Sequence, residues 1–384
     1  MGRAVKILHV IPGISPLFGG PSKVVFEMCR ELQRHGFQTE IATTDTDKEG
    51  NIDMPLEQPV EVEGVTVWCF RCHLLRKYGF SLGLTKWLKG HMSEYDIIHI
   101  HAFFSYVTAV AAYYAKRCRI PYIIRPIGEL DPWCLKRGLW KKSPFYRFFG
   151  WPLLLKAAAI HVTSQMELRG LVRLGLGQKC VVIPLGVEAA SYESLVRFTS
   201  SNGTCQLLFL SRVDPKKGLP LLLRAVRQLK NQGIDAELTV AGYGKPFYMA
   251  EMEGLAHRLS IEEQVHFSGF VAGRDKRRCL AAADVFVLPS YHENFGVAVT
   301  EAMAAGLPVI ISDQVALAQE VEESRAGRVI PAGSVDALAE AIEEIATDVT
   351  KQKDMGYRAR KLVEQRFTWS RAGKQLADLY RAVI

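Results

Sequence analysis

The stretch that decides the fold is Asp284–Ile311, which reads DVFVLPSYHENFGVAVTEAMAAGLPVII. Its residues 285–288 form a short apolar run that predicts a buried strand. From Phe295 onward, apolar residues recur at helical spacing until Gly306 and Pro308 stop the helix ahead of a second apolar run. The stretch therefore predicts a strand, a polar loop, a helix and a second strand in succession.

This stretch holds two glutamates, Glu293 in the predicted loop and Glu301 on the predicted helix. A helical rise of 1.5 Å per residue separates them by roughly 12 Å, somewhat less with the loop, whereas a retaining glycosidase needs its two carboxylates about 5 Å apart. We therefore expect them to grip two parts of one long ligand, with the N–H groups at the helix start stabilising an anion between them. The alternative is that Glu293 only complements the helix dipole and Glu301 lies on a solvated face.

The pattern E-N-F-G-x4-E-A-M-A-x-G-x-P-V-I resembles the E-x7-E signature of retaining GT-B glycosyltransferases of the family 4 type. In that family the first glutamate, Glu293 here, lies beside the donor sugar, and the second, Glu301 here, bonds the ribose hydroxyls of the nucleotide. The backbone that follows the first glutamate holds the sugar and the diphosphate in that family. The resemblance assigns this part to Asn294, Phe295, Gly296 and Val297.

The composition fits an ordinary globular enzyme. The chain has 384 residues, long enough for two domains, of which 48% are hydrophobic and 23% charged. We expect a cytoplasmic protein, because no signal peptide precedes the first strand-like run and no apolar stretch approaches the length of a membrane span. The eight cysteines are scattered, which fits a reducing compartment. Cys69-Phe-Arg-Cys72-His73 has the spacing of a c-type haem site, but haem attachment needs export, so structural thiols are favoured over haem or zinc.

Strands and helices alternate twice along the chain, which predicts two domains with parallel sheets. The polar residues 186–203 have no clear period and are interpreted as the linker between them. The expected domains are a Rossmann-like acceptor domain over 1–188 and a Rossmann-like nucleotide-sugar donor domain over 203–367, facing a cleft as in the GT-B fold. In that fold the terminal helix, 368–384 here, crosses back to the first domain.

A Gly/Pro-rich turn follows the first predicted strand at residues 12–21, and Ser22 is placed to cap the helix after it. Gly19 and Gly20 in this turn offer bare backbone N–H groups to a phosphate or a sugar. A simple tight turn is the alternative interpretation. The resemblance favours the first, because the family's first loop holds a Gly-Gly pair that faces the donor.

Two histidines, His99 and His101, alternate onto one face of a predicted strand and reach its carboxyl end. They are either hydrogen-bonded core side chains or, as the resemblance implies for His101, close to the donor sugar. Residues 126–133, PIGELDPW, resemble a loop of bacterial polysaccharide transferases that commonly reads P-H-G-M-L-D-P-W. Ile127 and Glu129 replace the usual His and Met, so the acceptor-side chemistry departs from that pattern.

Arg212 and Lys217 lie five residues apart at the carboxyl end of the second domain's first predicted strand. Two fixed cations neutralise a leaving diphosphate without a metal, and the family carries the same R-x4-K-G pattern. The alternative is a solvated pair at a helix start, where cations are unfavourable. No metal site is expected, since Asp45-Thr-Asp47 lies in a polar loop away from any strand end.

Two shorter matches complete the predicted nucleotide site. Gly242 and Gly244 match the family's G-x-G after its second strand, and Phe270 with Val271 matches the stretch whose backbone meets the base. For each of these matches, ordinary turn packing is the competing interpretation.

The positive charge is concentrated in the first half of the chain. Residues 1–188 hold 24 Lys and Arg against 16 Asp and Glu, so this half carries the whole net charge of +8. Many of the cations lie between residues 116 and 156, interleaved with Trp, Phe and Tyr. Such a surface suits anionic lipid headgroups or a polyphosphate, and no nucleic-acid motif accompanies it.

These observations and the resemblance together predict a metal-independent transferase without a further cofactor. It would move a hexose, with glucose favoured, from a UDP-sugar to a lipid-linked or oligosaccharide acceptor in envelope or exopolysaccharide synthesis, with the cytoplasmic chain peripheral on the membrane. The resemblance implies front-side attack, in which the leaving β-phosphate takes the acceptor proton while cations and helix N–H groups absorb charge. A UDP-sugar epimerase of the same fold and a nucleotide-sugar-binding protein without transfer activity are the alternatives.

Overall fold

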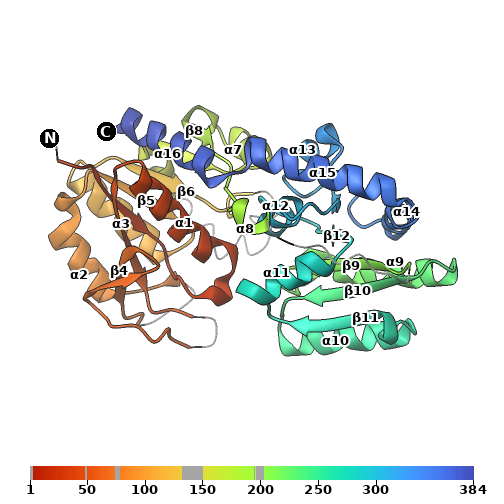
Figure 1. Cartoon of the computed structure of the whole chain (residues 1–384). Coiled ribbons are helices and arrows are strands. Elements are labelled where there is room, and N and C mark those ends of the chain that lie inside the picture. Colours follow the sequence, from red (N-terminus) through yellow and green to blue (C-terminus); the bar gives the residue numbers. More distant parts are fainter. Residues whose placement is uncertain (1–2, 48–49, 74–77, 132–149, 194, 196–202) are drawn as a thin grey trace. The chain divides into compact units, whose positions relative to one another are not determined.

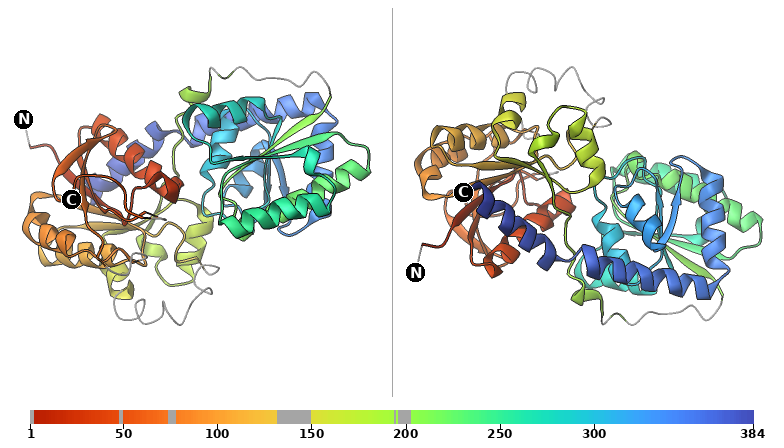
Figure 2. Two further views of the ribbon diagram at one scale, coloured as in Figure 1. Left: turned by 90° about the horizontal axis from the view of Figure 1, so that it is seen from below. Right: turned by 90° about the horizontal axis from the view of Figure 1, so that it is seen from above.

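The computed structural model describes residues 3–47, 50–73, 78–131, 150–193, 195 and 203–384. These residues divide into two compact units. Unit 1 comprises residues 1–185 together with 369–384, and unit 2 comprises residues 186–368. Each unit is built around its own sheet, with helices on both faces (Figures 1 and 2).

The sheet of unit 1 has eight strands in the order β3-β4-β2-β1-β5-β6-β7-β8, and all neighbours are parallel except β3 and β4. The strands that follow β1 in the chain are added on one side of it up to β4, and β5 and the later strands on the other, so the carboxyl ends of the parallel neighbours β1 and β5 flank the topological switch point. The strands are β1 (Lys6–Val10), β2 (Gln38–Thr44), β3 (Pro59–Val62), β4 (Val65–Phe70), β5 (Ile97–His101), β6 (Tyr122–Arg125), β7 (Ala159–Val162) and β8 (Cys180–Val182). The described α-helices of this unit are α1 (Gly20–Arg34), α2 (Leu82–His91), α3 (Tyr106–Arg117), α6 (Trp151–Lys156), α7 (Gln165–Val172) and α16 (Trp369–Val383).

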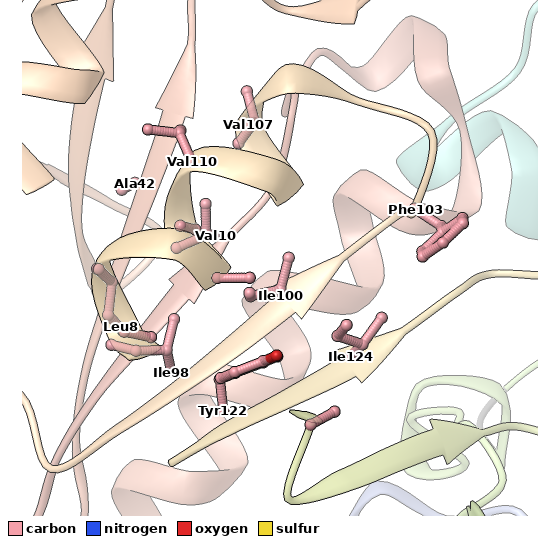
Figure 3. Close-up of a cluster of buried hydrophobic side chains, with 14 of the residues drawn as sticks. Leu8, Val10, Ala42, Ile98, Ile100, Phe103, Val107, Val110, Tyr122 and Ile124 are labelled. Atoms are coloured by element: carbon pink, nitrogen blue, oxygen red, sulfur yellow. The ribbon is translucent and has the colours of Figure 1, made fainter. Parts of the chain in front are cut away.

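The two faces of this sheet differ in chemistry. One face is apolar: Leu8, Val10, Ile98, Ile100 and Ile124 are fully buried there against residues of α2 and α3 (Figure 3). Because side chains alternate along a strand, the residues between these point to the opposite face. That face carries histidines, and α16 covers it beside α1 (Figure 1).

The sheet of unit 2 has six parallel strands in the order β11-β10-β9-β12-β13-β14. The strands are β9 (Cys205–Leu210), β10 (Ala236–Ala241), β11 (Val265–Gly269), β12 (Val285–Leu288), β13 (Val309–Ser312) and β14 (Gly327–Ile330). The α-helices are α8 (Ala190–Glu193), α9 (Leu219–Asn231), α10 (Pro246–Arg258), α11 (Gly273–Ala282), α12 (Val297–Ala304), α13 (Ala318–Ser324), α14 (Val335–Ala346) and α15 (Val349–Arg366).

Three local predictions need correction. Helix α1 begins at Gly20 and not after Ser22, because Gly19 takes the N-cap position with a positive φ of 81°. The Ser22 hydroxyl does not cap it and donates instead to the Ser15 carbonyl. Strand β3 lies inside residues 45–64, which were expected to be loop, and pairs with β4. Helix α12 begins at Val297, two residues later than the apolar spacing suggested.

Candidate functional site

Four parallel strands of unit 2, β11, β10, β9 and β12, end at the same edge of the sheet. Ligands of open α/β sheets bind at this carboxyl edge. The loops that leave it hold most of the predicted site residues: 211–218 after β9, 242–245 after β10, 270–272 after β11 and 289–296 after β12. The last of these leads into α12.

The two glycines after β10 allow two loops to touch. A Cβ atom on Gly242 would lie 1.8 Å from the Ser211 carbonyl oxygen, and one on Gly244 would lie 2.1 Å from that of Val213. The Val213 N–H donates to the Tyr243 carbonyl at 3.0 Å, which extends the pairing of β9 and β10 past the strand ends. Close backbone packing, the competing interpretation, therefore accounts for both glycines, and this packing fixes the backbone on either side of Arg212.

A second contact holds the turn that contains Lys217 against the loop after β12. The Asp214 carboxylate accepts the Lys216 N–H at 3.0 Å and caps a short turn at residues 215–217. Gly218 then takes a left-handed conformation, φ 73°, and a Cβ there would lie 2.1 Å from the Pro289 carbonyl oxygen. The Tyr291 N–H donates to the Lys216 carbonyl at 2.8 Å. Only a glycine permits this approach, which brings Lys217 beside Glu293.

Lys217 and Glu293 form an ion pair between the ammonium and Oε2 of the carboxylate. Their side chains are only 10% and 19% exposed. Burial raises the pKa of Glu293, but the charge and hydrogen bond of Lys217, with Lys216 and Arg212 nearby, outweigh it and leave the pKa below its usual value. The Glu293 backbone is held as well, since its N–H donates to Gln314 and its carbonyl accepts from Ala316. The carboxylate is therefore ionised and fixed on a rigid loop.

Arg212 is exposed and adds positive charge beside this pair. Asn294 is half-buried, and Gly296 takes the N-cap position of α12 in a left-handed conformation, φ 98°. Phe295 is 4% exposed and packs edge-on against Phe367 with ring centroids 5.8 Å apart. The backbone N–H groups at the start of α12 thus lie one turn from Glu293.

Glu301 lies on α12, as predicted, and its side chain is 5% exposed. Its Oε1 atom is 2.6 Å from the ammonium of Lys276, a residue of α11 that the sequence did not single out. The stretch before α11 contains Phe270, which is 55% exposed, and Val271, which is half-buried. An exposed aromatic ring at a strand end is available to stack on a planar ligand.

The unit 1 residues of the predicted site lie in a different setting. Gly19 needs its positive φ rather than space, because a Cβ there would meet nothing within 4 Å. Gly20 is the first residue of α1. His101 is fully buried, and both of its ring nitrogens have partners: Nε2 lies 2.9 Å from His9 Nδ1, and Nδ1 lies 3.4 Å from Arg125 Nη1.

We call the group formed by His9, His99, His101, His161 and Arg125 the histidine layer. Its members come from β1, β5, β6 and β7, and each is at most 2% exposed. Arginine only donates, so His101 accepts at Nδ1, carries its proton on Nε2 and donates to His9. Burial, reinforced by the charge of Arg125, lowers the pKa of His9 and of His161 to about 3. Burial also lowers the pKa of Arg125, to about 10.

Three of these histidines, His9, His99 and His101, could hold a metal by distance, since one nitrogen from each lies within 4.8 Å of the others. Arg125 contacts His101 directly, however, and a dication beside a buried guanidinium is strongly repelled. His99 is also engaged by the Tyr380 hydroxyl of α16 at 2.6 Å. The donor set therefore suits a neutral network better than a metal.

The structure brings one group of predicted residues together within unit 2: Arg212, Lys217, Gly242, Phe270, Val271, Glu293, Asn294, Phe295, Gly296, Val297 and Glu301. Gly19, Gly20 and His101 belong to unit 1. Sequence reasoning missed Lys276, although a cation near the start of a helix was a signal it had used for Lys217. It named Glu129 only as a departure from the family's loop and missed its role: the Glu129 carboxylate accepts the N–H groups of Phe103 and Phe104 and fixes the turn after β5.

Comparison with known proteins assigns a family to both parts of the chain. A model described as Glycosyltransferase Family 4 matches residues 18–191, and one described as Glycosyl transferases group 1 matches residues 196–362. The phosphatidyl-myo-inositol mannosyltransferase of Mycolicibacterium smegmatis is 33% identical over 214 residues, which make up 54% of this chain and 53% of that protein. The amylovoran biosynthesis glycosyltransferase AmsK of Erwinia amylovora is 30% identical over 223 residues, 56% and 54% of the two chains.

The chain spans about half the length of the curated relatives it matches. A solved structure extends the likeness in fold to nearly the whole chain. HepE of Anabaena, determined in complex with UDP and glucose, superimposes with a TM-score of 0.77 over 98% of this chain and 100% of that one, at 20% identity. Two family domains in succession and this shared architecture show that the chain belongs to the group 1 and family 4 glycosyltransferases and has the GT-B fold.

Proposed function

We propose that this protein transfers a hexose, with glucose favoured, from a UDP-sugar to a saccharide or lipid-linked acceptor, with retention at the anomeric carbon. The observation that carries the proposal is the pairing of Lys217 with Glu293, beside Arg212 and the start of α12. Two cations, an ionised carboxylate and the N–H groups at the start of α12 lie at one edge of a sheet. A nucleotide diphosphate sugar offers the matching charges and hydroxyl groups.

The chemistry follows from these charges. As the bond between the sugar and the β-phosphate breaks, negative charge grows on the diphosphate, and Arg212 and Lys217 neutralise it. The acceptor hydroxyl attacks the anomeric carbon from the same side and gives its proton to the leaving phosphate oxygen, so the sugar–phosphate bond is replaced by a glycosidic bond. Glu293 holds Lys217 in place before the donor arrives and binds hydroxyl groups of the sugar afterwards.

The donor assignment draws on the relatives. The structure of HepE was determined with UDP and glucose, which favours UDP-glucose here, whereas the name of the Mycolicibacterium smegmatis relative points to mannose. A thermal-shift screen with UDP-glucose, UDP-galactose and GDP-mannose separates these donors, because a ligand at 100 times its Kd adds about 2.7 kcal/mol of stability. Failure of every nucleotide sugar to raise the melting temperature would refute the proposal.

The proposed acceptor is a growing saccharide on a lipid carrier, in envelope or exopolysaccharide synthesis. AmsK is named for the biosynthesis of amylovoran, and the mannosyltransferase for phosphatidyl-myo-inositol. These two names support a saccharide acceptor and a lipid acceptor, respectively. Transfer is measured as UDP release from UDP-glucose with and without lipid-linked oligosaccharide, together with elongation of that acceptor. An isomerised UDP-sugar without elongation would favour the epimerase alternative, which neither family model supports.

Such an acceptor places the protein at a membrane surface. No helix among the described residues combines the length and apolarity needed to cross a bilayer, so contact would be peripheral. Much of the basic, aromatic stretch 116–156 lies outside the described residues, but its two ends are close together: a hydrogen bond with the side chain of Lys116, together with the charge of Lys116, lowers the pKa of Lys156. Tyr113 and Leu155, 55% and 47% exposed, lie near them in the chain.

Cations with exposed apolar side chains suit anionic headgroups. Co-sedimentation with vesicles that contain phosphatidylglycerol tests the surface. Binding should appear at low salt and be lost at high salt, because the Debye length shortens from about 10 Å at 0.1 M to about 3 Å at 1 M. Protein that stays in the supernatant at low salt would exclude the membrane contact and favour a soluble acceptor.

A further inference from the structure

Lys276 is a neighbour of the candidate site that the sequence motifs did not single out. It is the fourth residue of α11, its side chain is 18% exposed, and its ammonium lies 2.6 Å from Glu301 Oε1. The two helices that it joins, α11 and α12, follow different strands of the sheet, β11 and β12. This ion pair therefore ties the loop expected at the base to the helix expected at the ribose.

The position is poor for a cation on local grounds. Helix N-termini favour acidic residues, yet the first six residues of α11 include Arg274, Lys276, Arg277 and Arg278 with a single acid, Asp275. Arg274, Arg277 and Arg278 are exposed to solvent, whereas Lys276 turns towards Glu301. A cation that is unfavourable for its own helix is retained more readily when it serves a tertiary contact.

Glu301 needs such a contact because only 5% of its side chain is exposed. A carboxylate removed from water without a partner is strongly destabilised and becomes neutral. A neutral carboxylic acid has lost part of its capacity to accept hydrogen bonds, while an ionised one accepts at about four positions on its two oxygens. The bond to Lys276 favours the charged form, and the oxygens of an ionised carboxylate have lone pairs that can accept from hydroxyl groups as well.

We propose that Lys276 is a positioning residue for the nucleotide: it holds the Glu301 carboxylate charged and oriented so that it accepts the two ribose hydroxyls. This inference rests on the proposed function, in which Glu301 binds ribose. The inference adds Lys276 to that site. Lys276 would act on the ribose through Glu301, and not on the phosphates.

Calorimetric binding of UDP and of 2′,3′-dideoxy-UDP to the full chain tests this role. Lys276→Met should weaken UDP binding by roughly tenfold, which corresponds to about 1.4 kcal/mol, because Glu301 loses the charged donor that orients it. The same variant should bind 2′,3′-dideoxy-UDP as the wild type does, within about twofold, since that ligand has no hydroxyl for Glu301 to accept. Lys276→Arg should recover most of the affinity for UDP, because it restores the charge and the donor.

Arg277→Met is the matched control, since it removes one positive charge from the next, exposed position of α11 without touching Glu301. It should leave both affinities within about twofold of the wild type. Should Lys276→Met fail to fold, Lys276→Gln carries the same test, because it removes the charge and keeps a hydrogen-bond donor.

The outcomes distinguish a failure of this inference from a failure of the proposed function. Equal weakening of UDP and 2′,3′-dideoxy-UDP by Lys276→Met, or equal effects of Lys276→Met and Arg277→Met, would overturn the inference and leave the proposed function intact. A wild-type chain that binds neither UDP, GDP nor ADP would overturn the proposed function and this inference with it.

Discussion

The carboxyl edge of unit 2 and the histidine layer of unit 1 use similar polar side chains in opposite ways. At the unit 2 edge each buried carboxylate has a cation, Lys217 for Glu293 and Lys276 for Glu301, and the pairs keep partial access to solvent. In the histidine layer, Arg125 is 2% exposed and contacts an uncharged imidazole.

This difference in charge and solvent access indicates which of the two groups can bind a ligand. Ion pairs at the edge of solvent can exchange one partner for a phosphate or a hydroxyl group, because the groups stay charged and reachable. A network of neutral imidazoles closed off from water cannot do so without being opened. Among the described residues, the ion pairs at the carboxyl edge of unit 2 are therefore suited to bind a ligand, while the buried histidine layer is suited to stabilise unit 1.

The largest expected effect is acid destabilisation of unit 1. The folded pKa of His9 and of His161 is about 3, below the ordinary 6.5, so the unfolded chain binds more protons between these values. The two histidines therefore contribute fully to the stability of the folded state above pH 6.5. As the pH drops below this value, the free energy of unfolding falls, by about 2 kcal/mol for each histidine at pH 5. Hydrogen exchange at pH 7.5 and pH 5 should show amides of β5 and β6 losing protection before those of β12, and the reverse order would contradict the assignment.

Lys217→Ala tests the carboxyl edge of unit 2, where the charge of the side chain should affect turnover strongly and folding little. Loss of the cation leaves the departing diphosphate unneutralised, which should slow transfer by about 10²–10³-fold, or roughly 2.7–4 kcal/mol. Steady-state kinetics at saturating donor measure the effect, with the melting temperature as control. Near-normal turnover would show that Lys217 does not stabilise the leaving diphosphate.

The two glutamates of unit 2 should separate binding from turnover. Glu301→Ala should weaken UDP binding by about 1.5–3 kcal/mol, the value of hydrogen bonds to a charged group, because the ribose is remote from the breaking bond. Glu293→Ala should mainly lower kcat, since charge develops beside the sugar. Calorimetry with UDP alone compares them, and equal losses of UDP affinity would contradict the two roles.

The smallest expected effect is that of a chelator. If Arg212 and Lys217 neutralise the diphosphate, transfer should be unchanged in EDTA. The assay compares initial rates with EDTA, with EDTA followed by excess Mn²⁺, and without either. Loss of activity in EDTA with recovery on adding Mn²⁺ would show that a metal ion shares the neutralisation.

The sequence was sufficient for elements whose apolar pattern is strong. Strands β12 and β13 lie where the runs in residues 284–311 predicted them. The pattern failed for α15, a helix of 18 residues, because its charged sequence buries only a narrow stripe. It misplaced the start of α12, because Phe295 packs against Phe367, a contact that spacing within the helix cannot reveal.

The sequence pointed to Lys217, Glu293 and Glu301 as candidate site residues, but it did not show which side chains pair. Lys217 and Glu293 lie 76 positions apart in the chain, and Lys276 and Glu301 lie 25 apart. The alternation of His99 and His101 was visible in one strand, but His9 and His161 join them from β1 and β7 through the order of the strands. Pairing across strands depends on tertiary structure, and a single sequence carries no direct signal of it.

Helix α16 has a consequence for the order in which the protein is made. It covers the histidine layer through the bond of Tyr380 to His99, a contact that spans 281 positions of the chain. During synthesis the whole of unit 2 leaves the ribosome before α16 does. This face of the unit 1 sheet therefore stays uncovered until unit 2 has been synthesised, so unit 1 can complete its folding only after the unit that follows it in the chain.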